Sequence, residues 1–286
     1  MDPTAPTGLP RTSQLVWWPF AALLVLLVGT ELAADLLGGG DAWTEAAAGA
    51  WYLGWGAWAL RLCRRHGIGL RQLVGRPREP AAWGYVAMAL PLLLLSAGLF
   101  VLQMVLASWV APEAVREYLA GGQAVGGAPL AGALNLLATV AIAPVVEELV
   151  FRGVLLRSWT LRRGRTAAIL GTAALFAVLH PGDLVGSFVF GVVLGVIRLR
   201  TRTLLVPIAC HVLFNGLAAL MGAGGTPGGA DSALTIEALR AYWWAGAACI
   251  AAAAPILWIF LRRTLPRRRR PSSPRKKDES HTESTE

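Results

Sequence analysis

Charged residues are scarce in this sequence, at 15% of 286 residues, whereas a soluble domain usually carries about 25%. Hydrophobic residues instead make up 55%, and the mean hydropathy is +0.54. The apolar residues come in long runs, and a run of roughly 20 such residues matches a bilayer core about 30 Å thick. The scarcity of charge argues against an ordinary soluble domain and predicts a polytopic integral membrane protein.

Cysteine and lysine are also scarce. Cys63, Cys210 and Cys249 show no CxxC spacing, so we interpret them as small apolar fillers rather than as disulfide partners or metal ligands. Lys276 and Lys277 are the only lysines among 26 basic residues. This bias is typical of a GC-rich bacterial genome, and it suggests a bacterial cytoplasmic membrane as the location.

Eight apolar segments are candidate membrane spans, and backbone groups in lipid must be satisfied internally, so we expect an all-α transmembrane helical bundle. Segments 166–180 and 184–197 are short for complete spans and can form a hairpin that does not cross fully. Segment 81–110 is long and contains Pro91, which predicts a tilt, a kink or an interfacial turn. The first segment lacks a convincing cleavage site, so we expect it to be retained. The eight segments are 15–37, 43–62, 81–110, 133–156, 166–180, 184–197, 203–221 and 241–261.

Basic residues gather on one side of this bundle if eight spans alternate from a cytoplasmic N-terminus. All but three of the 26 basic residues then lie on the cytoplasmic side, the exceptions being Arg116, Arg240 and Arg152. The positive-inside rule therefore predicts that both termini are cytoplasmic. Topology explains the net charge of +9, so we expect the lipid bilayer and no nucleic acid as a partner.

Three regions follow from this pattern. Residues 1–14 are predicted to be a cytoplasmic segment, and residues 15–261 a transmembrane domain. The tail 262–286 is rich in Arg, Lys, Ser, Pro and Glu. This composition predicts a disordered basic tail near the cytoplasmic leaflet.

Three ionisable residues in the fourth span require an explanation, because inserting each one near the bilayer centre costs at least about 2.5–3.5 kcal/mol of free energy. Glu148 and Arg152 are four residues apart, so they can pair on one helix face. Glu147 points about 100° away around the helix and is left free for another partner. The spacing predicts a structural ion pair beside an available carboxylate.

Two histidines and an asparagine lie in or at the end of other apolar spans. His180 follows Phe176 by four residues and closes the fifth segment, while His211 and Asn215 share a face of the seventh. At 1.5 Å per residue from the cytoplasmic arginines, Glu147 is about 15 Å deep, His211 about 13 Å and His180 about 22 Å. We therefore expect these groups to converge around one polar cavity.

Such groups can perform hydrolysis, since they include a base for water, an acid for a leaving group and donors for an oxyanion. They could also bind a divalent metal. A structural network, or a proton or ion pathway, would use the same residue types. A transporter would instead show repeated halves or polar residues strung across the bilayer, whereas here the polar groups form one cluster at one level.

The motif Glu147-Glu148-x-x-x-Arg152, then Phe176-x-x-x-His180, then His211-x-x-x-Asn215 resembles the three-motif signature of the CPBP family. These are the CAAX-protease and bacteriocin-processing proteins, also called Abi proteins, and they include the Rce1-type prenyl-protein endoprotease. The resemblance implies peptide-bond hydrolysis within the membrane, on a membrane-embedded or lipidated protein or peptide. The alternative is a non-enzymatic immunity or scaffold protein of the same fold.

The resemblance also implies roles for the motif residues. Glu147 and His180 would activate water, while His211 and Asn215 would stabilise the oxyanion or complete a metal site. Glu148 and Arg152 would hold the geometry. Zinc is the cofactor to consider: Glu147, His180 and His211 could supply the three protein ligands that it needs, but Glu147 would then be less available as a base.

Overall fold

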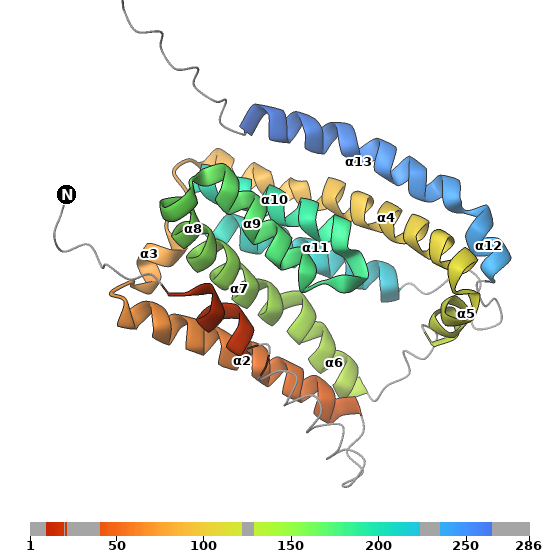
Figure 1. Ribbon diagram of the computed structural model, residues 1–286, viewed down its shortest axis with the longest axis horizontal. Coiled ribbons are helices and arrows are strands. Elements are labelled where there is room, and N and C mark those ends of the chain that lie inside the picture. Colours follow the sequence, from red (N-terminus) through yellow and green to blue (C-terminus); the bar gives the residue numbers. More distant parts are fainter. Residues whose placement is uncertain (1–9, 20, 22–40, 122–128, 224–234, 265–286) are drawn as a thin grey trace, which may run out of the picture.

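The computed structural model describes residues 10–19, 21, 41–121, 129–223 and 235–264, and these ranges contain helices and no strand (Figure 1). The sequence prediction of an all-α bundle is therefore confirmed. Three of the helices outline the bundle in Figure 1: α2 (Asp41–Arg65) lies along its lower edge, α13 (Trp243–Thr264) along its upper edge, and α4 (Ala89–Val110) beneath α13.

One long helical stretch from residue 129 to residue 163 crosses the middle of the bundle. It consists of α6 (Pro129–Leu137), the π-helix η3 (Ala138–Ile142), α7 (Ala143–Glu148), the π-helix η4 (Leu149–Leu155) and α8 (Leu156–Arg163). π-Helical turns inside α-helices are rare and occur frequently at functional sites. Here they flank the segment that ends in the two glutamates.

The short apolar segments form a hairpin, but its second helix extends to Thr201 and is long and apolar enough to cross a membrane. Helix α9 (Arg165–Val178) is followed by the 3₁₀ turn η5 (Pro181–Asp183) and by α10 (Leu184–Thr201), which packs back against α9. Gly191 allows the close approach, because a Cβ there would lie 2.9 Å from the Cα of Ala173. Pro181 cannot continue α9, so the turn is fixed directly after His180.

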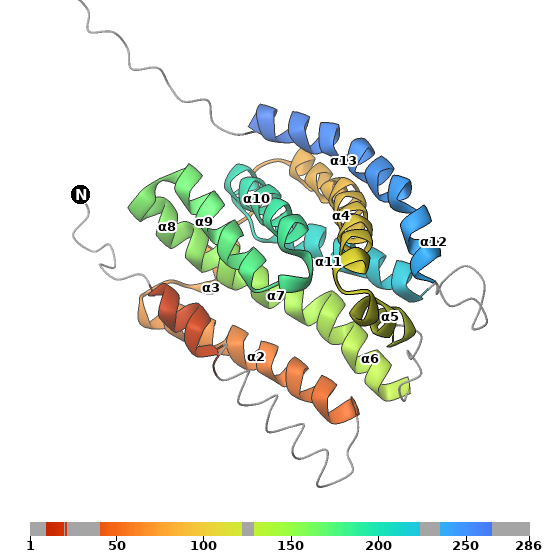
Figure 2. The same ribbon diagram turned by 45° about the vertical axis from the view of Figure 1, so that its right-hand side comes forward.

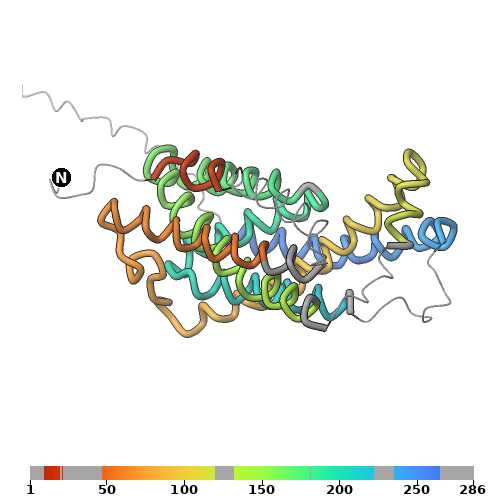
Figure 3. Tube along the Cα trace, turned by 90° about the horizontal axis from the view of Figure 1, so that it is seen from below, coloured from red at the N-terminus to blue at the C-terminus, as the bar shows by residue number. Residues whose placement is uncertain are grey.

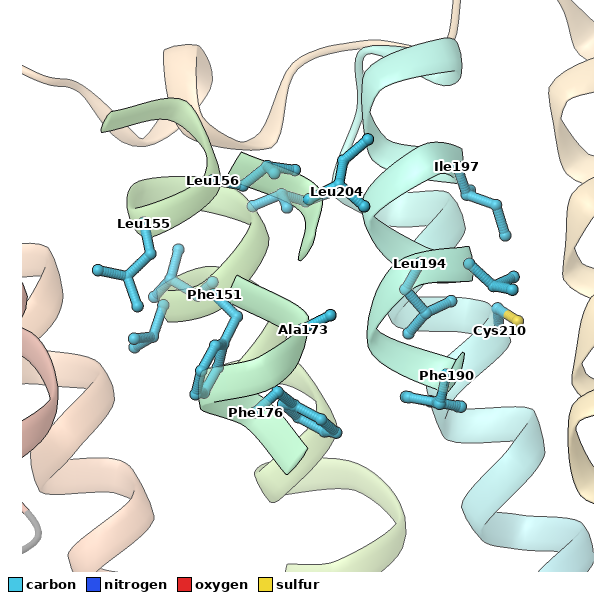
Figure 4. Close-up of a cluster of buried hydrophobic side chains, with 14 of the residues drawn as sticks. Phe151, Leu155, Leu156, Ala173, Phe176, Phe190, Leu194, Ile197, Leu204 and Cys210 are labelled. Carbon is cyan, nitrogen blue, oxygen red and sulfur yellow. The ribbon is translucent and has the colours of Figure 1, made fainter. Parts of the chain in front are cut away.

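A buried apolar cluster joins the long helix to this hairpin and to α11 (Leu205–Ala223), as Figure 4 shows. Phe151 and Phe176 meet edge to face with ring centroids 5.2 Å apart. Cys210 is buried in the same cluster, and all three cysteines are free. Cys63 and Cys210 are thus packed as small buried side chains, whereas Cys249 is only partly buried.

Helices α4 and α13 touch through two glycines. A Cβ at Gly98 would lie 2.6 Å from the carbonyl oxygen of Gly246, and a Cβ at Gly246 would lie 2.9 Å from that of Gly98. Small residues let membrane helices approach this closely, where van der Waals packing replaces the hydrophobic effect as the attraction. Figure 2 shows α13 lying along the outer side of α4.

The N-terminal π-helix η1 (Ser13–Trp17) is held on α2 by three tryptophans. The indole N–H groups of Trp51, Trp55 and Trp58 donate to the carbonyl oxygens of Pro19, Leu15 and Gln14 at 2.8, 2.7 and 2.9 Å. The tryptophan spacing places all three indoles on one face of α2. Trp51 and Trp55 are buried in this contact.

Helices α8 and α10 carry arginines in their last turns, Arg162 and Arg163 in α8 and Arg198 and Arg200 in α10, and we call this the arginine-rich end of the bundle. Helix α3 (Leu70–Val74) is hydrogen-bonded to the chain at this end. The backbone N–H of Leu204 donates to the carbonyl of Val74 at 2.7 Å, and Arg198 donates to the carbonyl of Leu73 at 3.1 Å. Two further short helices, α5 (Pro112–Gly121) and α12 (Ile236–Ala241), lie together at the opposite end (Figure 3).

The eight expected spans correspond only in part to the helices. Four helical stretches among the described residues are long and apolar enough to cross a membrane: Pro80–Val110, Gly132–Arg163, Leu184–Thr201 and Trp243–Thr264. Helices α9 and α11 are apolar but shorter. Most of segment 15–37, including Glu31, lies outside the described residues. The chain is a multi-pass membrane protein, while the span number and the orientation of the termini stay predictions.

The structure defines two segment boundaries, of which the second differs from the sequence expectation. Segment 81–110 starts with a 3₁₀ helix, η2 (Pro80–Met88), and α4 begins at Ala89. Pro91 therefore lies in the first turn of α4, where proline is tolerated. The second boundary is the C-terminal end of the transmembrane domain, where α13 continues to Thr264, beyond the expected start of the tail at residue 262.

Candidate active site

Glu148 is the centre of a buried ionic cluster. Its Oε1 lies 2.9 Å from Nη1 of Arg152 and 3.0 Å from Nδ1 of His211. The glutamate and the arginine are at most 3% exposed. The Arg152 guanidinium also lies over the ring of Phe176, 4.7 Å from its centroid. The expected pairing along the helix is therefore present, and it extends to a histidine on α11.

Glu147 points to a different set of partners. Tyr52 of α2 donates its hydroxyl to Oε1 of Glu147 at 3.0 Å. The other oxygen, Oε2, lies 3.9 Å from Nε2 of His211. Glu147 therefore lies between two helices that are distant from it in the sequence, as its position around the helix predicted.

His180 is fixed by the end of α9. Its Nδ1 lies 2.8 Å from the carbonyl oxygen of Phe176, and its ring stacks on the Phe176 ring at 4.3 Å between centroids. A carbonyl oxygen only accepts, so Nδ1 carries a proton and donates in this contact. The four-residue spacing of Phe176 and His180 thus sets the tautomer of the histidine.

Asn215 lies one turn beyond His211 on α11. Its Nδ2 donates to the carbonyl oxygen of Thr139 at 2.8 Å. That carbonyl belongs to the π-helical turn η3, which ties α11 to the long helix beside the glutamates. One amide hydrogen and the amide oxygen of Asn215 remain for other partners.

A cavity of about 350 Å³ collects these side chains. Such a volume is within the range of small-molecule pockets. Glu148 and Arg152 do not line it but lie beneath its floor. The cavity is lined by Ala48, Tyr52, Ser96, Asn135, Ala138, Thr139, Ala143, Glu147, Phe176, His180, Asp183, Ser187, Phe190, His211, Phe214 and Asn215.

The sequence analysis missed Tyr52 and Asp183 as members of this cavity. Tyr52 is the one polar side chain that α2 contributes to the lining, but no motif on α2 distinguishes it from the aromatic residues around it. Asp183 accepts from the backbone N–H of Gly186 at 3.0 Å and so caps α10. The sequence feature that could have indicated Asp183 was its position two residues after the dipeptide His180-Pro181.

Zinc was the metal that the sequence analysis considered. Among the described residues, no three His, Cys, Asp or Glu side chains come together in a way that could hold a metal ion. Glu147 and His211 approach each other, but His180 does not complete a set with them. The side chains therefore do not form the three-ligand site that zinc needs.

Comparison with known families adds an independent result. Residues 129–217 match the family described as type II CAAX prenyl endopeptidase, Rce1-like. This part of the chain is similar to the Rce1-like family. The match covers all six motif residues, from Glu147 to Asn215. No curated protein and no solved structure gave a match to the chain.

The matched residues supply most of the cavity lining, and helices outside the match supply the rest. Tyr52 on α2 and Ser96 on α4 both line the cavity but precede the matched residues. The family match, together with the apolar helices, supports a protease of the membrane. The helices outside the match add side chains to the site that the family motifs do not contain.

Proposed function

We propose that this chain is an intramembrane endopeptidase that hydrolyses a peptide bond of a membrane-associated protein or peptide. The observation that supports it is the shared cavity, onto which Glu147, His180, His211 and Asn215 all face. A carboxylate, two imidazoles and an amide around one cavity are the groups that amide hydrolysis needs. The similarity of this part of the chain to the Rce1-like family supports the same reaction class.

In this proposal Glu147 is the general base and His180 orients the water. Tyr52 holds Oε1 of Glu147, which leaves Oε2 to take a proton from the water. The lone pair on Nε2 of His180 accepts the second hydrogen and directs the water oxygen at the scissile carbonyl. The proton held by Glu147 then passes to the leaving amine, so that one water is consumed and a carboxylate and an amine are released.

His211 and Asn215 stabilise the oxyanion. Glu147 and Glu148 carry two negative charges and Arg152 one positive charge, so a protonated His211 leaves the buried cluster neutral. Buried charges are costly unless they are paired in this way. His211 then donates through Nδ1 to Glu148 and through Nε2 to the developing oxyanion. The second amide hydrogen of Asn215 adds another donor.

The direct test is cleavage of a peptide library by the purified protein in lipid nanodiscs, with products identified by mass spectrometry. We expect the wild type to cleave and His180→Ala to lose activity by at least about 100-fold, because general acid–base groups contribute 10²–10⁴-fold. His66→Ala, in the loop after α2, is the matched histidine control and should cleave normally. Equal cleavage by wild type and His180→Ala would contradict the proposed mechanism.

Tyr52 gives a second prediction. Tyr52→Phe removes the hydroxyl that holds Glu147 and leaves the ring in place, so we expect kcat to fall roughly 10-fold with KM nearly unchanged. Tyr85→Phe is the matched control, since Tyr85 is also partly buried but packs on Phe260 away from the cavity. A change in KM alone would show that Tyr52 binds substrate instead of positioning the base.

Metal removal gives a third prediction. The proposed water activation uses only side chains, so treatment with a strong chelator should leave the cleavage rate unchanged. The measurement is the cleavage rate before and after chelation, together with the metal content of the purified protein by elemental mass spectrometry. A rate that is lost on chelation and restored by Zn²⁺ would replace the metal-free mechanism with a zinc-dependent one.

A further inference from the structure

The cavity lies in one half of the bundle, and the arginines lie at the end of the other half. On α2, Ala48 and Tyr52 line the cavity, whereas Arg61, Arg64 and Arg65 follow in its last two turns. On the stretch 129–163 the lining residues run from Asn135 to Glu147, whereas the arginines from Arg157 onward are in α8.

The other helices have the same polarity. Helix α9 starts at Arg165 and contributes Phe176 near its end, while α10 contributes Ser187 and Phe190 near its start and carries Arg198 and Arg200 in its last turn. Four helical segments, of which α9 runs in the opposite chain direction to the other three, thus agree on which end faces the cavity. Because helices that run in opposite directions agree, the shared polarity does not result from the order of residues along the chain.

Exposure along the long helix shows where the cavity opens. Asn135 and Thr139 are exposed, whereas Glu147 is 5% exposed and Glu148 is completely buried. The exposed residues are those farthest from the arginines of α8. Among the described residues, the mouth therefore lies at the α6 end of the long helix, and Glu147 is the lining residue of this helix farthest from it.

The opposite direction is closed by the apolar cluster of Figure 4. Phe151, Leu155 and Leu204 fill the space between the glutamates and the arginine-rich end, and none of them is more than 1% exposed. Closer to the arginine-rich end, α3 is hydrogen-bonded to α10 and to the turn between α10 and α11. A peptide could not reach Glu147 from that end without opening this core.

We propose that the site opens to the non-cytoplasmic side of the membrane and takes the extracytoplasmic part of a membrane-anchored peptide as its substrate. The arginine-rich end is cytoplasmic by the positive-inside rule, so the mouth at the α6 end faces the other side. The lining is suited to an extended peptide, because Asn135, Thr139 and Ser187 offer hydrogen bonds beside the rings of Phe190 and Phe214. The substrate clause rests on the proposed peptidase function, whereas the direction of the mouth does not.

The test is the accessibility of single cysteines to a membrane-impermeant, positively charged methanethiosulfonate. Cys63 and Cys210 are buried, so only Cys249→Ala is needed as the background, and its own labelling sets the baseline. Asn135→Cys and Thr139→Cys report on the mouth. Glu79→Cys, exposed in the loop before η2, reports on the arginine-rich end.

We expect Asn135→Cys and Thr139→Cys to be labelled in right-side-out spheroplasts of a bacterial expression host, with loss of that labelling in inverted vesicles. Glu79→Cys should show the reverse. Labelling of the mouth cysteines only in inverted vesicles, equally in both, or in neither would each overturn the proposal. Labelling needs no turnover, so the expected pattern without peptide cleavage would refute the peptidase function alone, and cleavage with the reverse pattern would refute the direction alone.

Discussion

Glu147→Gln is expected to abolish peptide cleavage, by at least about 100-fold, while the protein remains folded. The amide keeps the shape of the side chain and can still accept the hydrogen bond from Tyr52, but it cannot take a proton from water. Cleavage rate and thermal unfolding temperature should be measured on the same preparation. Near-wild-type cleavage would show that Glu147 is not the base.

Glu148→Gln is the contrasting variant, because it changes a carboxylate one residue away that does not line the cavity. It leaves Arg152 without its charged partner at a fully buried position, where breaking an ion pair costs about 3–5 kcal/mol. We expect lower stability as well as lower activity, and Arg152→Ala should behave in the same way. Glu79→Gln, on an exposed loop, is the control that should change neither property.

The comparison of the two glutamates also tests the orientation of the helix. If the variants exchange phenotypes, so that Glu148→Gln is stable and inactive, the carboxylate chemistry would stand but the assignment of the base would be wrong. Only loss of activity without loss of stability identifies the residue that acts on water. Loss of both identifies the residue that holds the cluster.

Gly75→Ala is expected to produce the largest loss of stability among the glycine variants, by more than about 2 kcal/mol. Gly75 has a φ of 68°, and a Cβ there would lie 2.2 Å from the carbonyl oxygen of Arg202. The backbone strain and the collision with another backbone group act together. The variant should loosen α3 from the turn between α10 and α11, and its unfolding temperature should fall.

Two neighbouring glycines separate these causes. Gly67 has a φ of 70° but no neighbouring atom within 4 Å of an added Cβ, so Gly67→Ala should show only the strain, about 1–2 kcal/mol. Gly69 has a φ of −79° and equally open surroundings, so Gly69→Ala should be nearly neutral. Equal unfolding temperatures for Gly75→Ala and Gly67→Ala would show that the contact with Arg202 does not matter.

The sequence was a good guide to the motif residues because each is costly in an apolar span. The pairing of Glu148 with Arg152 followed from helical spacing alone, and the structure contains it. The convergence of Glu147, His180, His211 and Asn215 followed from their similar depths, and all four line one cavity. Their chemical roles stay predictions, since position alone does not measure reactivity.

The sequence was a poorer guide where a partner comes from a distant helix. Tyr52 is 95 residues from Glu147, and an isolated tyrosine in an apolar span is usual at membrane interfaces. The partner of Glu148 on α11 was missed for the same reason. Span number was also uncertain, because α9 and α11 are too short to meet the length expected of a complete crossing.

The sequence by itself determined the membrane setting, the helical class, the family motifs and the ion pair within one helix. Each of these depends on composition or on spacing along a single helix, where the geometry is fixed at 1.5 Å and 100° per residue. Only the tertiary structure decided that Tyr52 holds Glu147, that His211 meets Glu148, and which end of the cavity is open. Those facts depend on how helices pack against each other, which small residues such as Gly98 and Gly191 permit at particular places and which hydropathy does not encode.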